Sequence, residues 1–159
     1  MAAPSLRNPQ SRKSKPARSL RARGLALLAR REYSRHELSK RLAPFTEDPA
    51  EIPALLDDFE QRGWLSEERV VEQVLASRRR RFGAGRIAHE LREKGISEAA
   101  IGDAREKLKM SEIETARAVW RRKFKAAPAD ARERARQMRF LQGRGFSLDT
   151  IRRLLRDDE

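Results

Sequence analysis

Residues 77–97 read SRRRRFGAGRIAHELREKGIS, and this stretch shows how the chain is organised. Four consecutive arginines, Arg78–Arg81, close one helical pattern, and the sequence Phe-Gly-Ala-Gly that follows interrupts it. A second helical pattern then places its apolar residues three to four positions apart and ends at Gly95. The order of helix, sharp turn, helix and glycine stop predicts a helical array with an arginine-rich surface.

The composition of the whole chain agrees with an all-α fold. Of its 159 residues, 38% are hydrophobic and 38% charged, and only 8 glycines and 7 prolines interrupt the helical patterns. No alternating apolar run predicts a strand. The chain has no cysteine, which excludes disulfides and thiolate metal sites. No apolar run approaches the roughly 20 residues that span a bilayer, and the N-terminus lacks the apolar segment of a secretory signal.

The net charge of +13 favours a polyanionic partner, but the charge is distributed unevenly. Residues 1–23 carry seven basic and no acidic side chains, so the remaining residues contribute only +6. We expect residues 1–18 to be a disordered tail, because little in them can be buried. Two roles stay open for it, a phosphate-seeking arm and a solubilising tail. Its Arg- and Ser-rich composition also loosely resembles a mitochondrial transit peptide.

Capping residues and apolar spacing place the expected helices. Ser-x-x-Glu capping boxes are predicted at Ser34 with Glu37 and at Ser111 with Glu114. A first helix is expected over about Leu20–Glu32, and a third begins between Asp48 and Ile52. The residues expected to point inward are Leu20, Gly24, Leu27, Leu28, Arg31, Leu38, Leu42, Ile52, Leu55, Leu56, Phe59, Val71, Val74, Leu75, Ile87, Leu91, Ile101, Ala104, Leu108, Ile113, Ala116, Trp120, Phe124, Ala131, Ala135, Met138, Leu148, Ile151, Leu154 and Leu155.

A glycine stop, an apolar residue and a serine cap recur along the chain. The three copies are Gly63-Trp64-Leu65-Ser66, Gly95-Ile96-Ser97 and Gly145-Phe146-Ser147. A Glu-Leu pair also follows an arginine-ended helix twice, at Glu37-Leu38 and at Glu90-Leu91. These recurrences predict an elongated array of three tandem three-helix repeats, a short solenoid, with units at 19–66, 67–110 and 111–159. The alternative is one irregular bundle in which the caps recur by chance.

Residues typical of catalysis or cofactor binding are scarce. The two histidines, His36 and His89, have no second ligand at metal-binding spacing. Gly83-Ala84-Gly85 lacks the strand and the Lys-Ser/Thr of a phosphate loop, so we interpret it as a tight turn. No nucleophile has an adjacent base. We therefore predict a protein that is not an enzyme and binds neither metal nor cofactor.

The basic residues after position 77 are the candidate contact surface, because the arginine fork suits phosphates and carboxylates. Arg78 is left out of the candidates, because part of its side chain is expected to pack along the apolar stripe of its helix. Tyr33, Trp64, Phe82 and Trp120 are interpreted as core residues and not as base-stacking platforms. The alternative is an ordinary solvated face. The candidate residues for binding are Arg79, Arg80, Arg81, Arg86, Arg117, Arg121, Arg122 and Lys123.

Three motifs follow one another along the chain: Tyr33-Ser34-x-x-Glu37-Leu38-x-x-x-Leu42, Gly63-Trp64-Leu65-Ser66-Glu67-Glu68-Arg69 and Arg81-Phe82-Gly83-x-x-Arg86-Ile87-x-x-Glu90-Leu91-x-x-Lys94-Gly95-Ile96. Their order and spacing resemble those of the RecX family, bacterial regulators of the RecA recombinase. The resemblance covers about residues 19–155 and is strongest from Tyr33 to Ile96. The chain departs from the family in the loop 44–51 and in Trp64, where tyrosine is more usual. The basic tail lies outside the match.

The resemblance implies a modular helical protein that binds RecA assembled on single-stranded DNA. Such a protein lies in the filament groove, hinders filament extension, and lowers strand exchange and ATP hydrolysis by RecA. It implies a mainly negative regulator in the cytoplasm, and we expect a monomer that also contacts DNA through backbone phosphates. Two other hypotheses stay open: a general nucleic-acid-binding protein that acts without RecA, and an adaptor for another acidic partner.

Overall fold

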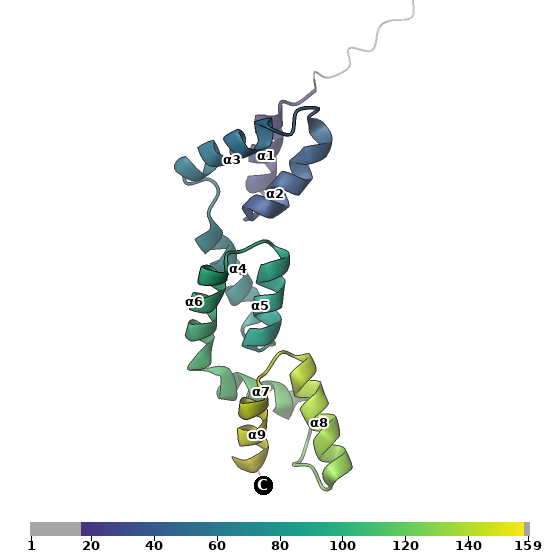
Figure 1. The fold of residues 1–159 in the computed structure, drawn as a ribbon. Coiled ribbons are helices and arrows are strands. Elements are labelled where there is room, and N and C mark those ends of the chain that lie inside the picture. Colours follow the sequence, from purple (N-terminus) through teal and green to yellow (C-terminus); the bar gives the residue numbers. More distant parts are fainter. Residues whose placement is uncertain (1–16, 158–159) are drawn as a thin grey trace, which may run out of the picture.

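The structure, a computed structural model, describes residues 17–157, and the predicted tail falls largely outside this range. Within it the chain forms helices and no strand (Figure 1). The elements are α1 (Leu20–Leu28), α2 (Arg35–Leu42), the 3₁₀ turn η1 (Ala43–Phe45), α3 (Glu51–Gln61), α4 (Glu67–Arg78), α5 (Ala84–Glu93), α6 (Glu98–Lys109), α7 (Glu112–Lys123), α8 (Ala131–Gly143) and α9 (Leu148–Asp157). None of these helices is long and apolar enough to cross a membrane.

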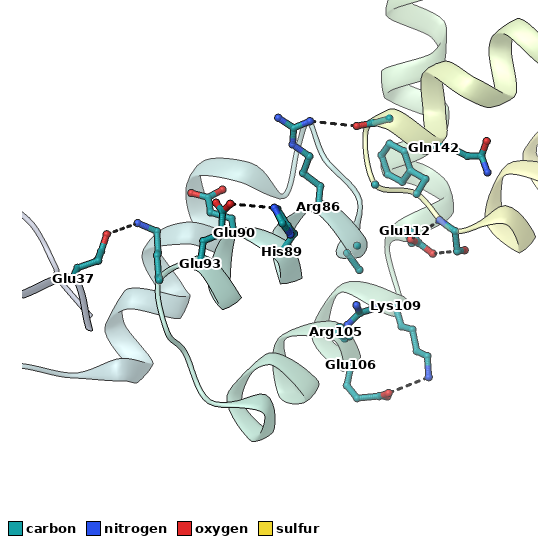
Figure 2. Close-up of a pocket in the computed structure, with 17 residues that line it drawn as sticks. Glu37, Arg86, His89, Glu90, Glu93, Arg105, Glu106, Lys109, Glu112 and Gln142 are labelled. Atoms are coloured by element: carbon teal, nitrogen blue, oxygen red, sulfur yellow. Dashed lines mark hydrogen bonds and ion pairs between the residues drawn. The ribbon is translucent and has the colours of Figure 1, made fainter. Parts of the chain in front are cut away.

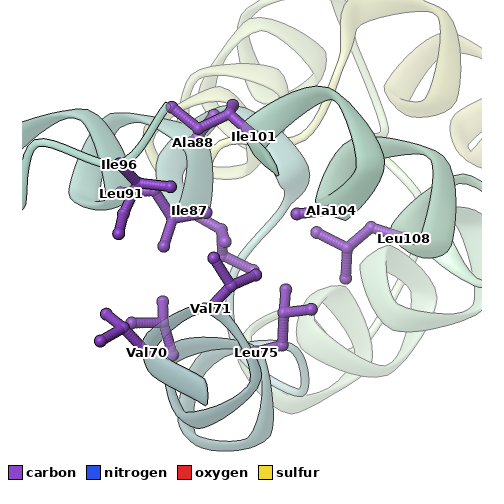
Figure 3. Packing of buried hydrophobic residues seen from close by; sticks show 11 residues of the cluster. Val70, Val71, Leu75, Ile87, Ala88, Leu91, Ile96, Ile101, Ala104 and Leu108 are labelled. Atoms are coloured by element: carbon purple, nitrogen blue, oxygen red, sulfur yellow. The ribbon is translucent and has the colours of Figure 1, made fainter. Parts of the chain in front are cut away.

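The helices are grouped in threes and stacked end to end in an elongated array (Figure 1). We call the groups unit 1 (α1–α3), unit 2 (α4–α6) and unit 3 (α7–α9). Each has its own hydrophobic cluster, centred on Phe59, Ile87 and Leu154 respectively. In unit 2 the buried valines of α4 meet Ile87 and Leu91 of α5 and Ile101 of α6 (Figure 3). Separate small cores are what a solenoid requires, because each unit buries its apolar face locally.

Side-chain caps begin most of the helices, and left-handed glycines end several. The capping box is present at α2, where Ser34 Oγ accepts from the Glu37 amide and Glu37 Oε2 accepts from the Ser34 amide at 2.9 Å. Ser66 and Ser97 cap α4 and α6 with the side-chain oxygen, which accepts from the amide of Arg69 and of Ala100 respectively. Gly63, Gly95 and Gly145 have φ of 73°, 74° and 90°, a conformation in which glycine avoids a Cβ clash.

The joint between units 1 and 2 is built by side chains. Ser34 Oγ donates to the Lys94 carbonyl, and Lys94 Nζ lies 2.9 Å from Glu37 Oε1. His36 packs on Gly95 so closely that a Cβ at Gly95 would lie 2.6 Å from the His36 Cβ. The turn before α2 therefore docks on the turn between α5 and α6.

The joint between units 2 and 3 uses the corresponding turns but joins them by backbone. The Gly83 amide donates to the Arg144 carbonyl at 2.8 Å, and the Gly85 amide donates to the Gly145 carbonyl at 3.0 Å. A Cβ on Gly83 would lie 2.4 Å from the Gly145 oxygen, and one on Gly145 would lie 2.4 Å from the Arg86 nitrogen. Gly83 itself has an ordinary φ of −80°. The glycines of the Gly-Ala-Gly segment thus allow close contact between units, which the tight-turn interpretation did not foresee.

Several sequence-based expectations about local structure were wrong. The first helix ends at Leu28, because the chain must become extended to place Ser34 as the cap of α2. Ser111 forms no capping box: only two residues separate α6 from α7, and its Oγ bonds back to the Leu108 carbonyl at 3.5 Å. Trp64 is 41% exposed and lies on the surface, packed obliquely on Phe59.

In unit 3 a polar residue replaces an expected apolar one in the core. Ala131 is exposed, whereas Gln137 is buried. Gln137 Oε1 accepts from the Trp120 indole at 2.7 Å, and its amide nitrogen donates to the Ala126 carbonyl at 3.3 Å. Leu148, the first residue of α9, is 42% exposed because only its later turns face the core.

The recurrences in the sequence are real but do not all occupy equivalent places. Gly95 and Gly145 separate the second and third helices of their units, whereas Gly63 separates unit 1 from unit 2. Counted from the helix starts, Leu38 of α2 corresponds to Ile87 of α5. The Glu-Leu pair Glu90-Leu91 therefore lies one turn later than Glu37-Leu38.

Candidate nucleic-acid interface

The four arginines that end α4 divide into one structural and three exposed residues. Arg78 is half-buried, and its Nε lies 3.1 Å from Glu90 Oε2. Arg79, Arg80 and Arg81 are exposed in the turn before α5. Within residues 17–157 no carboxylate pairs with these three guanidinium groups. Arg78 is thus engaged within unit 2, in agreement with its exclusion from the candidate residues, and the other three guanidinium groups are available at the surface.

Arg86 extends from the first turn of α5 across the joint to unit 3. Its Nη1 donates to the Gly143 carbonyl at 3.3 Å, and its guanidinium carbon lies 4.8 Å from the centre of the Phe82 ring. Arg144 of unit 3 lies 5.4 Å from the same ring. One aromatic ring of unit 2 is thus contacted by cations from both units.

The alternation of cations and rings continues into unit 3. Arg144 lies 5.3 Å from the Phe140 ring, and Lys123 Nζ lies 5.8 Å from it. Phe140 packs edge-on against Phe124, with ring centres 5.4 Å apart. We call Arg86, Phe82, Arg144, Phe140 and Lys123 the arginine–aromatic row. It orders long cationic side chains in one place, because each is held by a ring face.

The remaining predicted residues lie on α7 and are not all alike. Arg121 and Arg122 are exposed in its last turn, next to Lys123. Arg117 has a side chain only 29% exposed, and its Nη2 lies 4.0 Å from Asp157 of α9. Arg86 and Lys123 are therefore brought together through the row, whereas Arg117 is engaged by unit 3 itself.

A cleft of about 1370 Å³ runs along the array and is lined by residues of all three units (Figure 2). Its cations are Arg86, Lys94, Arg105 and Lys109, and its acids are Glu37, Glu90, Glu93, Glu106 and Glu112. Several are paired with one another, as in Lys109 Nζ with Glu106 Oε1 at 3.0 Å (Figure 2). A surface of balanced charge suits contact with a protein better than with phosphates alone.

At one end of this cleft Glu37 is held as a carboxylate. Desolvation favours its neutral form, but the Ser34 amide, Lys94 and Arg31 together outweigh that effect and lower the pKa of Glu37 below its ordinary value.

No group of three or more metal-ligating side chains occurs in the described part of the chain.

Sequence comparisons identify the family. Residues 66–104 match the model of the second three-helix domain of RecX, and residues 111–155 match that of the third. The regulatory protein RecX of Leptothrix cholodnii is 52% identical over 143 residues, which cover 90% of this chain and 91% of the relative. The chain belongs to the RecX family. The regulatory protein RecX of Ralstonia nicotianae is 44% identical over 137 residues, 86% of each chain.

A solved RecX structure has the same fold. The crystal structure of RecX from Lactobacillus salivarius superimposes with a TM-score of 0.75 and covers 87% of this chain and 93% of its own, at 17% sequence identity. The predicted all-α array of three-helix repeats is therefore confirmed, and the alternative of a single irregular bundle is wrong.

The sequence interpretation missed two members of the arginine–aromatic row. Arg144 was not predicted to contact anything, and Phe140 was not assigned to any face of its helix. Phe82 had been assigned to the core alone, although it is partly buried and also contacts two guanidinium groups. An available signal was the parallel between Lys94-Gly95 and Arg144-Gly145, two cation–glycine pairs at equivalent turns of neighbouring units.

Proposed function

We propose that this RecX-family chain is a non-enzymatic, mainly negative modulator of RecA. It binds in the groove of the RecA–single-stranded DNA filament, hinders filament extension, and lowers strand exchange and ATP hydrolysis. The observation that carries the proposal is the row of ordered cations at the joint of units 2 and 3, flanked by the unpaired Arg79, Arg80 and Arg81. Membership of a family of regulatory proteins supports it.

In this proposal one surface of the chain binds DNA and another binds the RecA protein. The unpaired arginines contact DNA phosphates, because bidentate guanidinium groups match phosphate geometry and none of these three has an acidic partner within residues 17–157. The cleft of balanced charge contacts the protein part of the filament, where complementary charges fix the register of docking. An elongated array suits a filament, since successive units can contact successive subunits (Figure 1).

We further propose unit boundaries at 19–66, 67–110 and 111–159, since one hydrophobic cluster falls within each range. The chain acts as a monomer in the cytoplasm, and residues 1–18 serve either as a phosphate-seeking arm or as a solubilising tail.

Titration into labelled single-stranded DNA, with and without RecA and at two salt concentrations, tests this function. We expect tight binding to the RecA filament and weaker binding to bare DNA that falls steeply with salt, since phosphate contacts release counterions. Equal binding to bare DNA and to the filament at physiological salt would instead support a general nucleic-acid-binding protein. Binding to neither would support an adaptor for another partner.

A further inference from the structure

The cations of unit 1 fall into two groups that differ in their partners. One group is paired with acids: Arg21 lies 2.8 Å from Asp58, and Arg35 lies 2.7 Å from Asp57. The other group has no acidic partner within residues 17–157 and consists of Arg23, Arg30, Lys40 and Arg41, to which Arg18, just before unit 1, is added. Unit 1 therefore keeps several cations unpaired although acidic residues are available in the same unit.

The unpaired cations surround one pocket of about 440 Å³ between α1, α2 and η1. This volume falls within the range of about 300–1,000 Å³ that is typical of ligand pockets. Among the described residues, no carboxylate lines it. Besides the five cations, its lining residues are Ala26, Leu27, Leu42, Pro44 and Phe45. The pocket thus combines a purely cationic rim with an apolar floor.

Phe45 gives this pocket an aromatic surface. The residue is 53% exposed, unusually so for a large apolar side chain, and η1 holds it directly after Pro44. The Arg23 guanidinium carbon lies 3.9 Å from the centre of its ring. The ring is therefore ordered by a cation while much of it remains open to solvent.

We propose that this pocket binds single-stranded nucleic acid, with the cations on the phosphates and one base stacked on Phe45. A positive groove with an exposed aromatic ring is the usual composition of single-strand sites, because every base offers a flat face. A duplex would satisfy the cations but leaves no base face for the ring. The site works without RecA and does not rest on the function proposed above.

Two other occupants fit the charges less well. Residues 1–16 carry Arg7, Arg12, Lys13 and Lys15 and no acid, so the chain's own N-terminal segment would be repelled by the rim. An anionic membrane surface needs a protruding apolar face, whereas here the apolar floor lies inside a ring of cations.

Fluorescence anisotropy of the full chain, without RecA, tests the site with a short labelled single strand and the same strand made abasic. We expect Phe45→Ala to weaken binding of the intact strand about tenfold and Phe45→Trp to restore it. On the abasic strand the two variants should bind like the unmodified chain. Circular dichroism checks that helicity is retained, as expected for a half-exposed residue.

A second pair of variants tests the cationic rim. Arg30→Ala with Arg41→Ala should reduce the slope of log affinity against log salt by about 1.4, at about 0.7 per phosphate contact on a single strand. The control, Arg62→Ala with Arg92→Ala, removes the same charge from arginines that are already ion-paired, and should leave the slope unchanged.

Three results would overturn the site: unchanged affinity of Phe45→Ala for the intact strand, an equal loss on the abasic strand, or equal slopes for the two double variants. If Phe45→Ala lost binding to anionic vesicles but kept its affinity for the strand, the ligand of the pocket would be a membrane surface instead. If the variants behave as expected but the chain does not bind the RecA filament, the proposed function is refuted and this site is not.

Discussion

The two joints of the array occupy the same place in the repeat yet are built differently. At the first, between units 1 and 2, a side-chain hydroxyl, an ion pair and an imidazole contact the turn Lys94-Gly95. At the second, between units 2 and 3, two glycine amides meet two carbonyl oxygens of the turn Arg144-Gly145 at 2.8 and 3.0 Å. The comparison shows that the same docking of turns can be stabilised chiefly by polar side chains, as at the first joint, or chiefly by backbone hydrogen bonds from glycines, as at the second.

The two joints are therefore expected to differ in their sensitivity to pH and to substitution. Charge at the first joint responds to pH, but the side chains can adjust when a neighbour changes. Backbone contact at the second joint involves no titrating group, yet nothing there can move aside for an added atom, because a Cβ on Gly83 would meet backbone atoms. The arginine–aromatic row crosses this second, rigid joint.

The largest expected effect comes from Gly83→Ala at the second joint. The added Cβ would lie 2.4 Å from the Gly145 oxygen and 2.5 Å from the Phe146 nitrogen, so units 2 and 3 must separate locally. We expect the free energy of unfolding to fall by about 1–3 kcal/mol, the usual cost of overpacking, as measured by urea denaturation.

Gly102→Ala is the matched control for this substitution. Gly102 lies within α6, and a Cβ there would meet nothing within 4 Å. Because alanine favours helix over glycine, we expect a gain of up to about 1 kcal/mol. Equal effects of the two substitutions would mean that the second joint does not depend on backbone contact.

A smaller effect is expected from Glu37→Gln at the first joint. Glutamine can keep the capping box with Ser34 but loses the ion pair with Lys94, so unfolding should become easier by about 1 kcal/mol at neutral pH. The pKa of Glu37 is lowered in the folded state, so its contribution to stability is present above the unfolded pKa of about 4.3 and is lost as pH falls through the folded value.

The unmodified chain should therefore lose stability on acidification more steeply than Glu37→Gln, with the difference between them closing below about pH 4. Urea denaturation at a series of pH values measures this. A constant difference between the two proteins down to pH 3 would show that the ion pair does not stabilise the first joint.

Much of the fold could be predicted from the sequence because its signals are local. Ser34 with Glu37 and the stop at Gly95 act within one helical turn, and the structure has both. Some of the failures, such as the burial of Gln137, depended on contacts between residues far apart in the sequence. Gln137 could not be predicted as core, since its burial is favourable through the indole of Trp120 and the carbonyl of Ala126, two partners that lie outside its own helix.

The candidate interface was predicted less completely for the same reason. A run of arginines such as Arg79–Arg81 can be recognised directly in the sequence. The row could not be recognised, because Phe82 and Arg144 meet only when two units dock. The pocket around Phe45 was missed because its cations come from α1, α2 and the residues on either side of α1, where paired arginines such as Arg21 and Arg35 also lie.

The measurement that tests the central claim most directly is strand exchange and single-stranded-DNA-dependent ATP hydrolysis by RecA, with this chain at micromolar excess. We expect the unmodified chain to lower both activities. The variant with Arg79→Ala, Arg80→Ala and Arg81→Ala should keep its helicity and lose most of the inhibition, because its phosphate contacts are gone. A folded, unmodified chain that changed neither activity would contradict the account.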